Sequence, residues 1–374
     1  MQLTSRTLTA ARAPAPDLAR GLMLLFIALA HSYLLLYAVE DVRAPGFGDR
    51  VTVFLEGLVV NHRARPMFIL LFGYGLAQLA LRRRGRGDSW SAVRSLVRRR
   101  GLWLLLLGLL HVALLFYDVL TMYGIASLVL AGTLTWSDAR LWQALRIALL
   151  GVALAFAVYG TLSATEGFSL VIGQDSPIFT PWDRIVEWLR MAVFMTWQVV
   201  PGVVLGIWAA RRRILEEPHR HQTLLARTAV VGLGSSLLGG IPFALMNAGF
   251  WPGPTPFAAG SAAVLHGITG YAGGVGAAAL VGLIALRLPV PAHPVAVAVQ
   301  ALGQRSLTFY LFQSVAFVTL MAPFALGLGG ELRYVGAAGI AAGTWMVSVA
   351  GAYWLHRAGH RGPAEVLLRR LSRS

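Results

Sequence analysis

The chain contains no cysteine and no lysine, and acidic residues are few. The absence of cysteine from all 374 residues excludes disulfides, thiolate metal sites and a cysteine nucleophile. All 32 basic residues are arginine, against 16 acidic ones, a composition typical of a GC-rich bacterial genome. The net charge of +16 lies beside apolar runs and is not interleaved with aromatic residues. We therefore expect anionic lipid, and no nucleic acid, to face this charge.

Motifs of common soluble enzymes are also missing. There is no Walker-type phosphate loop, no G-x-S-x-G nucleophile elbow and no H-E-x-x-H zinc motif. His356 and His360 lie one helical turn apart, but no third metal ligand accompanies them. We therefore expect no metal and no tightly bound cofactor.

What the chain has in abundance is apolar sequence. Apolar residues make up 57% of the chain and charged residues only 13%. A soluble domain cannot bury that much apolar surface, whereas a bilayer can, and about 20 apolar residues cross its ~30 Å core. Ten runs approach or exceed that length: 20–39, 64–81, 101–117, 119–135, 141–163, 185–209, 225–247, 258–286, 296–323 and 333–355.

The predicted fold is an all-α, polytopic integral membrane helical bundle of about ten transmembrane helices. With the N-terminus inside, the inner segments hold 24 arginines and the outer segments seven, including Arg63, Arg65 and Arg184. The positive-inside rule then places both termini in the cytoplasm. No small-x-small cleavage site follows the first run, so it should remain as an anchor in the bacterial cytoplasmic (inner) membrane. We expect a loose tail over 1–19, a membrane domain over 20–355 and a basic tail over 356–374.

Polar residues inside the apolar runs are the candidate functional residues, because they are costly at that depth. Arg20 and His31 are separated by eleven positions, about three helical turns, and should share a face. His31 is either a general base near the bilayer midplane or a histidine that only joins two helices. His111 should lie at a similar depth in the third run. Asp118 follows it by roughly 10 Å of helical rise, so we expect no direct contact between them.

For three further sets of residues, both a structural and a functional interpretation remain open. Asp118 either caps the fourth run or serves as a functional acid. In the ninth run, Ser306, Tyr310 and Gln313 follow Arg305 on one helical face, which either joins helices or lines a cavity. Arginines of the 82–100 connection either bind lipid head groups or hold the phosphates of a coenzyme.

Five short motifs together resemble the YeiB-like family of bacterial membrane proteins, catalogued as domain of unknown function 418 (DUF418). In chain order they are Asp17-x-x-Arg20-Gly21, Leu70-Leu71-Phe72-Gly73-Tyr74-Gly75, Gly108-Leu-Leu-His111 with Asp118-Val-Leu-x-x-Tyr123-Gly124, Gly303-x-Arg305-x-Leu307-Thr308-x-Tyr310-Leu311-x-Gln313, and Gly362-Pro363-x-Glu365 followed by Arg369. The resemblance covers nearly the whole chain. Each motif is weak alone, and the order makes the set fairly specific.

The resemblance implies kinship with transmembrane acyltransferases. In the related acyltransferase-3 proteins a basic residue, ten intervening positions and a histidine mark the first helix, and Arg20 and His31 have this spacing. Most YeiB-like proteins have asparagine where His31 stands. The third-helix arginine pair of acyltransferase-3 proteins is absent in its usual spacing; here Arg94 is followed by Arg98 and Arg99. Kinship of fold does not fix activity.

The first hypothesis is therefore a membrane acyltransferase. Acyl-CoA, the co-substrate, approaches from the cytoplasm, and arginines such as Arg20, Arg98 and Arg99 hold its phosphates. His31 acts as general base on the hydroxyl or amine of a sugar, lipid or small-molecule acceptor, and His111 and Asp118 line the acceptor side. The other residues expected to bind substrate are Tyr123, Arg305, Tyr310 and Gln313.

Two other classes remain open. Ten helices with midplane polar groups also suit a transporter or exporter of a small or lipid-like molecule, although the halves 1–180 and 190–374 show no convincing inverted repeat. A structural or sensory membrane protein is the third reading. A second copy of the chain is a candidate partner in each case.

Overall fold

The protein is described from a computed structural model, which covers residues 13–36, 46–115, 118–166, 180–289 and 293–373. All regular structure in these residues is helical. In the first half the helices are α1 (Pro14–Ser32), α2 (Phe47–Val59), α3 (Ala64–Arg84), α4 (Trp90–Leu114), α5 (Leu120–Val129), α6 (Asp138–Glu166) and α7 (Pro181–Trp197). In the second half they are α8 (Val199–Arg211), α9 (Gln222–Asn247), α10 (Pro256–Leu286), α11 (Pro294–Gln304), α12 (Ser306–Met321), α13 (Tyr334–Arg357) and α14 (Pro363–Arg373).

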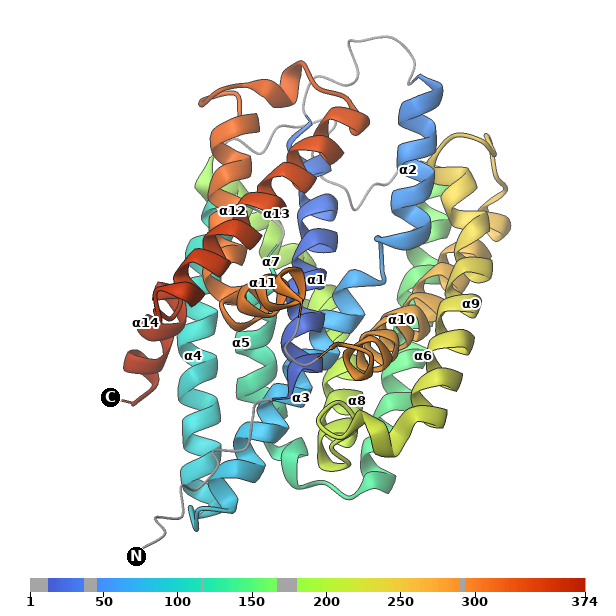
Figure 1. The fold of residues 1–374 in the computed structure, drawn as a ribbon. Coiled ribbons are helices and arrows are strands. Elements are labelled where there is room, and N and C mark those ends of the chain that lie inside the picture. The colour runs from blue at the N-terminus through green and yellow to red at the C-terminus, as the bar shows by residue number, and fades with distance from the viewer. Residues whose placement is uncertain (1–12, 37–45, 116–117, 167–179, 290–292, 374) are drawn as a thin grey trace, which may run out of the picture.

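The long helices run side by side as a bundle around α1 and α3, as the ribbon in Figure 1 shows. Among the described residues, six helical segments are long and apolar enough to cross a membrane. They are Pro14–Leu35, Phe47–Arg84, Asp138–Thr165, Pro218–Asn247, Pro256–Leu286 and Tyr334–Arg357. Leu120–Thr135, Val199–Arg211 and Ser306–Met321 are shorter apolar helices. The chain is therefore a multi-pass membrane protein.

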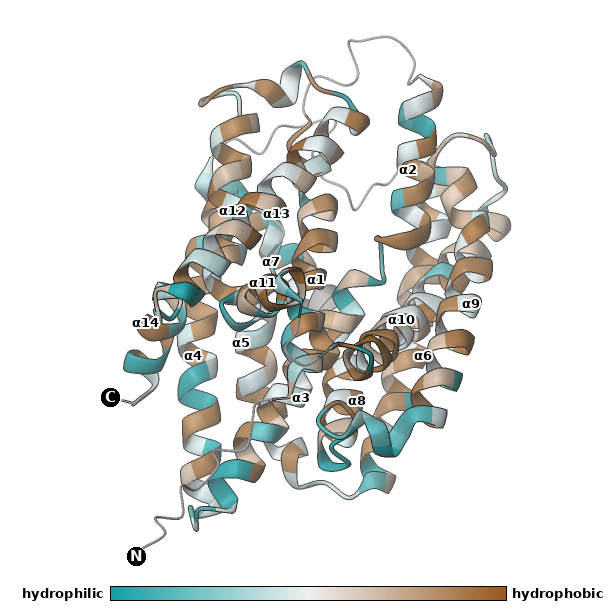
Figure 2. Cartoon of the chain, in the orientation of Figure 1, coloured by the Kyte–Doolittle hydropathy of each residue, from teal (hydrophilic) through white to brown (hydrophobic). Residues whose placement is uncertain are grey.

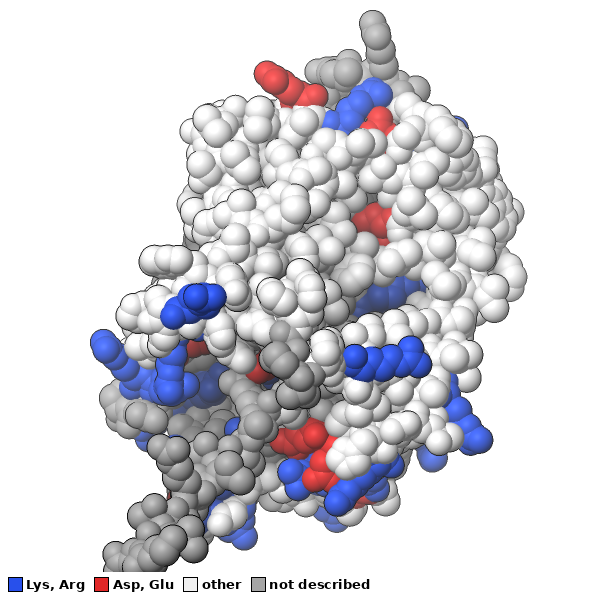
Figure 3. Space-filling view, viewed as in Figure 1, with Lys and Arg blue, Asp and Glu red and all other residues white. Residues whose placement is uncertain are grey.

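Hydrophilic residues and charge gather at one end of the bundle. Figure 2 colours this end most strongly where α3 passes into α4 and around the connection from α8 to α9. In the space-filling view of the same face, most basic side chains lie in the lower half, whereas the upper half shows only a few charged side chains (Figure 3). Large apolar side chains such as Leu150, Leu238 and Trp354 are exposed along the flanks, as expected for surfaces that meet lipid.

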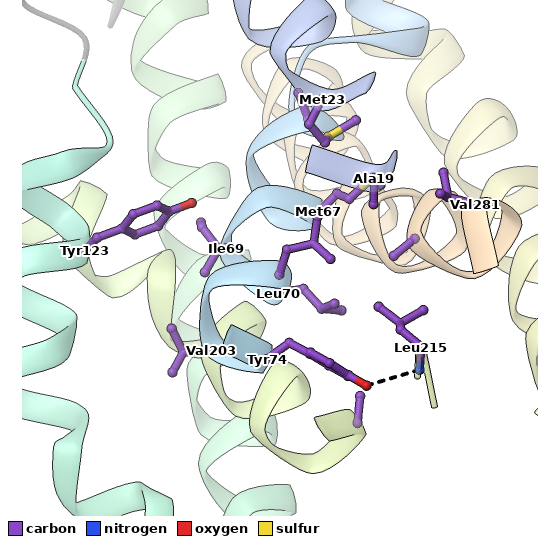
Figure 4. Close-up of a cluster of buried hydrophobic side chains, with 14 of the residues drawn as sticks. Ala19, Met23, Met67, Ile69, Leu70, Tyr74, Tyr123, Val203, Leu215 and Val281 are labelled. Carbon is purple, nitrogen blue, oxygen red and sulfur yellow. Dashed lines mark hydrogen bonds between the residues drawn. The ribbon is translucent and has the colours of Figure 1, made fainter. Parts of the chain in front are cut away.

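The core is built on α3, which packs against α1 on one side and α8 on another. Figure 4 shows Met67, Leu70 and Tyr74 of α3 among apolar neighbours, with the Tyr74 hydroxyl accepting a hydrogen bond from the backbone N–H of Leu215 at 3.2 Å. Glycine makes the close packing of α3 and α8 possible. A Cβ on Gly73 would collide with the backbone of Val203.

Three predicted segments differ from the structure. Residues 47–59 were expected as part of a polar connection but form the helix α2. Its charged side chains made this segment look unlike a membrane span. After a short break, the chain continues into α3. The run 185–209 is divided at Gln198, because Pro201 has no N–H for the carbonyl of Trp197. The run 296–323 is divided at Arg305.

The expected tail boundaries also fall elsewhere. The helix α1 already begins at Pro14, so the boundary placed after residue 19 lies inside it; residues 1–12 are outside the described part of the chain. The predicted basic tail contains α14, which packs against α4 and α12. Both ends of the membrane domain are thus extended by helix.

A buried arginine joins α2, α3, α9 and α10. Arg63, expected in an outer connection, is only 6% exposed. Its guanidinium donates to Ser236 Oγ and Ser236 O at 2.8 Å each and to the carbonyls of Gly57 and Asn61 at 2.7 Å, and Nη1 lies 3.0 Å from His266 Nδ1. We call Arg63, Ser236 and His266 the Arg63 cluster. It ties the break between α2 and α3 to two other helices.

Candidate functional site

A second buried polar group lies where α1, α4, α5 and α12 meet. His111, near the end of α4, has Nδ1 2.8 Å from Asp118 Oδ1 and Nε2 2.7 Å from Ser314 Oγ. The side chains of His111 and Asp118 are 1% and 0% exposed. We call His31, His111, Asp118, Tyr310 and Ser314 the central cluster.

The contact between His111 and Asp118 overturns the prediction that helical rise keeps them apart. That prediction assumed a helix continuing to residue 118. Instead α4 ends at Leu114, and Leu115 has extended backbone angles, φ −139° and ψ 119°. Because the helix stops, the rise does not accumulate, and the chain brings Asp118 back to the imidazole.

The end of α4 is held by Arg184 of α7. Its Nη1 donates to the carbonyls of Ala113 at 2.8 Å and Leu114 at 2.9 Å. These carbonyls lie in the last turn of α4, where the helix itself supplies no donor. Arg184, expected only as an outer arginine, is therefore a capping group that helps to set the position of Asp118.

Asp118 combines the two readings that the sequence left open. Its Oδ2 accepts from the backbone N–H of Thr121 at 2.5 Å and from Thr121 Oγ1 at 2.6 Å, which caps the start of α5. Its Oδ1 faces His111 and also accepts from the Tyr310 hydroxyl at 3.4 Å. The carboxylate is thus fixed by α5 and α12 while it faces the imidazole.

His31 and Tyr310 complete the central cluster. The ring of Tyr310 lies 4.9 Å from that of His111 and 5.9 Å from that of His31, measured between centroids. His31 is half-buried and has no hydrogen bond to any described residue. The first helix therefore brings its histidine to the same tyrosine that contacts Asp118.

Several polar atoms around the cluster lack partners among the described residues. The Tyr123 hydroxyl and Gln313 Oε1 are buried without a hydrogen bond, and His111 Nδ1, although 2.8 Å from Asp118 Oδ1, does not meet hydrogen-bond geometry with it. Tyr123 stacks on Phe72 at a centroid distance of 3.9 Å. Gln198 Nε2, at the break between α7 and α8, is also unpartnered, while Gln198 Oε1 accepts from Arg65 Nη1 at 3.3 Å. Buried polar atoms without partners are rare and are typical of sites that bind a ligand or water.

The predicted arginine sites lie apart from the histidines. Arg20 Nη1 pairs with Asp17 at 3.3 Å, and Nη2 donates to the carbonyl of Leu71 at 3.3 Å, so the first two motifs meet. Arg98 and Arg99 are exposed on α4, near the charged end, and Arg98 Nε donates to the carbonyl of Leu128 at 3.3 Å. Arg98 and Arg99 thus lie toward the charged end of the bundle, while Arg20 joins α1 to α3.

The fourth and fifth motifs form one joint. Arg305 donates to the carbonyls of Ala301 and His360, so its guanidinium is held by backbone. Glu365 accepts from the N–H groups of Leu307 at 2.8 Å and Thr308 at 3.2 Å and thereby caps α12. Arg305, expected to bind substrate, therefore has a clear structural role at the break between α11 and α12.

The structure also bears on Gln313 and on the predicted absence of a metal site. Gln313 is 2% exposed, and its Nε2 lies 3.4 Å from Ser348 Oγ. Among the described residues, no group of three or more histidine and acidic side chains could hold a metal ion. The sequence reading missed Ser314, Arg65, Arg184 and Gln198. Only Ser314 carried a signal, because it follows Tyr310 by four residues and so shares its helical face.

The fold and the site define a class of protein: a multi-pass helical membrane protein with an incompletely bonded polar site inside the bundle. Residues 209–374 match the model of a family described as protein of unknown function (DUF418), so the C-terminal part of the chain is similar to this family. The matched region holds Tyr310, Ser314 and the Arg305–Glu365 joint; His31, His111 and Asp118 precede it. No curated protein and no solved structure matches the chain.

Proposed function

We propose that the chain crosses a bacterial cytoplasmic membrane ten times, with both termini inside. Three of the crossings each consist of two consecutive helices: α2 with α3, α7 with α8, and α11 with α12. The other crossings are α1, α4, α5, α6, α9, α10 and α13. The basic end of the bundle faces the cytoplasm in this arrangement, as the positive-inside rule requires.

The absence of cysteine makes this topology directly testable. Single cysteines introduced as Arg86→Cys, between α3 and α4, and Pro252→Cys, between α9 and α10, act as reporters in intact cells. A maleimide that cannot cross membranes should label the second and not the first. Labelling in the reverse pattern, or of both positions, contradicts the proposed orientation.

We further propose that the site transfers an acyl group from cytoplasmic acyl-CoA to a hydroxyl or amine acceptor. The observation that carries this proposal is the buried His111, held between the Asp118 carboxylate and the Ser314 hydroxyl. A histidine oriented by a carboxylate is the arrangement of a general base in acyl transfer. The carboxylate favours the imidazolium that forms when the base accepts a proton.

The remaining residues divide between donor and acceptor. Arg20, with Arg98 and Arg99 nearer the basic end, is proposed to meet the phosphates of acyl-CoA, for which guanidinium groups are well suited. His31 has no competing hydrogen bond to a described residue and faces Tyr310, so it is the proposed base on the acceptor. Tyr310, Tyr123 and Gln313 are proposed to line the path of the acyl group.

The test is acyl-CoA binding and transfer by the purified protein. Arg20→Ala should weaken binding, and His31→Ala should abolish transfer while binding persists. His219→Ala, in the connection before α9, is the matched control and should leave both unchanged. Full transfer in His31→Ala removes His31 from the mechanism, and no binding at millimolar acyl-CoA over several chain lengths removes the acyltransferase proposal.

Export of a small or lipid-like molecule is the second candidate, and one feature favours it. Three crossings are broken, near Arg63, at Gln198 and at Arg305, and discontinuous helices are typical of transporter binding sites. Purified protein in liposomes should then move a substrate without any acyl donor. Failure over a broad substrate panel would weigh against export.

A further inference from the structure

We propose that Ser314 is an acyl-accepting nucleophile, so that transfer proceeds through an ester on this serine. The inference rests on the proposed function for its acyl donor, but not for its geometry. Ser314 Oγ lies 2.7 Å from His111 Nε2, and His111 Nδ1 lies 2.8 Å from Asp118 Oδ1. A hydroxyl, an imidazole and a carboxylate in this order are the elements of an activated serine.

The direction of proton transfer follows from the charges. The negative charge of the Asp118 carboxylate, whose Oδ1 lies 2.8 Å from Nδ1, favours the tautomer with hydrogen on Nδ1. Nε2 of His111 then carries a lone pair and faces Ser314 Oγ. The serine hydroxyl is thereby hydrogen-bonded to a base that can remove its proton.

The serine has one competing acceptor. Ser314 Oγ lies 3.3 Å from the carbonyl of Tyr310, the common back-bond of a serine inside a helix. The contact with His111 is shorter by 0.6 Å, from 3.3 Å against 2.7 Å. The imidazole is therefore the better partner for the hydroxyl hydrogen.

The covalent cycle balances without a further reagent. Ser314 Oγ attacks the thioester carbonyl carbon, and its proton passes to His111 Nε2. The C–S bond then breaks, the coenzyme thiolate takes that proton and leaves as the thiol, and the acyl group remains as a serine ester. In the second half, His111 Nε2 takes the proton of the acceptor hydroxyl or amine as the acceptor attacks the ester carbonyl carbon. The bond between the acyl carbon and Ser314 Oγ then breaks, and His111 Nε2 returns that proton to Ser314 Oγ.

The surroundings favour such an ester. Ser314 is 1% exposed, so bulk water has little access to the ester. Tyr123, whose ring stacks on Phe72, has a buried hydroxyl without a partner among the described residues.

Reaction with a fluorophosphonate tests the nucleophile without acyl-CoA. The reagent phosphonylates an activated serine and releases fluoride, and peptide mass spectrometry locates the adduct. Wild-type protein should react at Ser314, Ser314→Ala should lose that adduct, and His111→Gln should react at least 100-fold more slowly. Ser348→Ala is the matched control, because Ser348 is also a buried helical serine, with its hydroxyl on the carbonyl of Thr344. It should react like the wild type.

The outcomes separate this inference from the proposed function. A folded wild-type protein without an adduct on Ser314, or with an adduct that forms equally fast in His111→Gln, overturns the nucleophile. Acyl transfer that persists in Ser314→Ala also overturns it and leaves the acyltransferase proposal standing. An adduct on Ser314 in a protein that does not consume acyl-CoA supports Ser314 as a nucleophile and overturns only the proposal that acyl-CoA is the donor.

Discussion

The central cluster and the Arg63 cluster are two buried polar groups in one bundle, and they differ in how completely their atoms are bonded. In the Arg63 cluster, the guanidinium directs its donors to carbonyl, hydroxyl and imidazole acceptors of four residues, Gly57, Asn61, Ser236 and His266. In the central cluster, His31 has no hydrogen bond to a described residue, and Tyr123 and Gln313 beside it retain unpartnered atoms.

The difference separates two uses of buried polarity. A fully bonded group holds helices together, because removing any member leaves the others unsatisfied. A partly bonded group has atoms ready for a ligand, at some cost to the stability of the empty protein. Burial of histidine and charge is common to both regions, so burial alone does not mark the functional one. Each region should therefore respond to substitution according to how completely its polar atoms are bonded.

The largest expected effect is on reactivity at the central cluster. Asp118→Asn removes the negative charge that stabilises a protonated His111 and no longer favours hydrogen on Nδ1. We expect fluorophosphonate labelling of Ser314 to slow by about 10²–10⁴-fold, the usual contribution of general acid–base catalysis. Asn can still accept from Thr121, so thermal unfolding should change little. A labelling rate near that of the wild type would show that the carboxylate is only a helix cap.

The Arg63 cluster should respond in the opposite way. Arg63→Met leaves the carbonyls of Gly57, Asn61 and Ser236 without their donor in an apolar interior. We expect a loss of about 3–5 kcal/mol of stability, because each buried acceptor left without a donor costs about 1–3 kcal/mol. Thermal unfolding in detergent measures it. Labelling of Ser314 per folded molecule should be unchanged.

The exposed Arg190 is the control for this prediction. Its side chain is 72% exposed and pairs with Glu187 at 3.0 Å. Arg190→Met should cost no more than about 1 kcal/mol, because exposed ion pairs contribute little. If both arginine variants unfold alike, or if Arg63→Met abolishes labelling in the folded fraction, the division into a structural and a functional cluster is wrong.

Arg184, which caps the end of α4, should affect both stability and the reactivity of the central cluster. Arg184→Met removes two hydrogen bonds to the last turn of that helix, for which we expect a loss of about 1–3 kcal/mol. Because the end of α4 helps to position Asp118, labelling of Ser314 should also slow, by about tenfold. Arg184→Lys, which can restore one donor, should recover part of both. Lost stability with unchanged labelling would show that Asp118 is positioned by α5 and α12 alone.

The sequence could predict the helices and the polar residues but not the contacts between them. Apolar runs and arginine placement are local signals, and they located most helices. The contact of His111 with Asp118 depends on where α4 stops, and the group that caps its end, Arg184, lies 70 residues away from Leu114. No periodicity within 101–117 contains that information.

The breaks in three helices were hidden for related reasons. Residues 47–59 are too short and too charged to resemble a membrane span, and they become part of one only by continuing into α3. At Arg305, the break depends on Glu365 and on the carbonyl of His360, which follow much later in the chain. Ser314 was also missed, although its spacing of four residues from Tyr310 was a local signal that could have placed it on the polar face of α12.

The smallest expected effect concerns the joint between α12 and α14. A substitution there tests whether the cap of α12 influences the reactivity of Ser314 on the same helix. Glu365→Gln keeps an oxygen for the N–H groups of Leu307 and Thr308 but removes the charge at the helix N-terminus. We expect a loss of about 0.3–1 kcal/mol and a slightly lower unfolding temperature. Ser314 lies two turns further along α12, so its labelling should stay within about twofold of the wild type. A large loss of labelling would mean that the joint positions Ser314, and the functional region would then extend to the C-terminal helix.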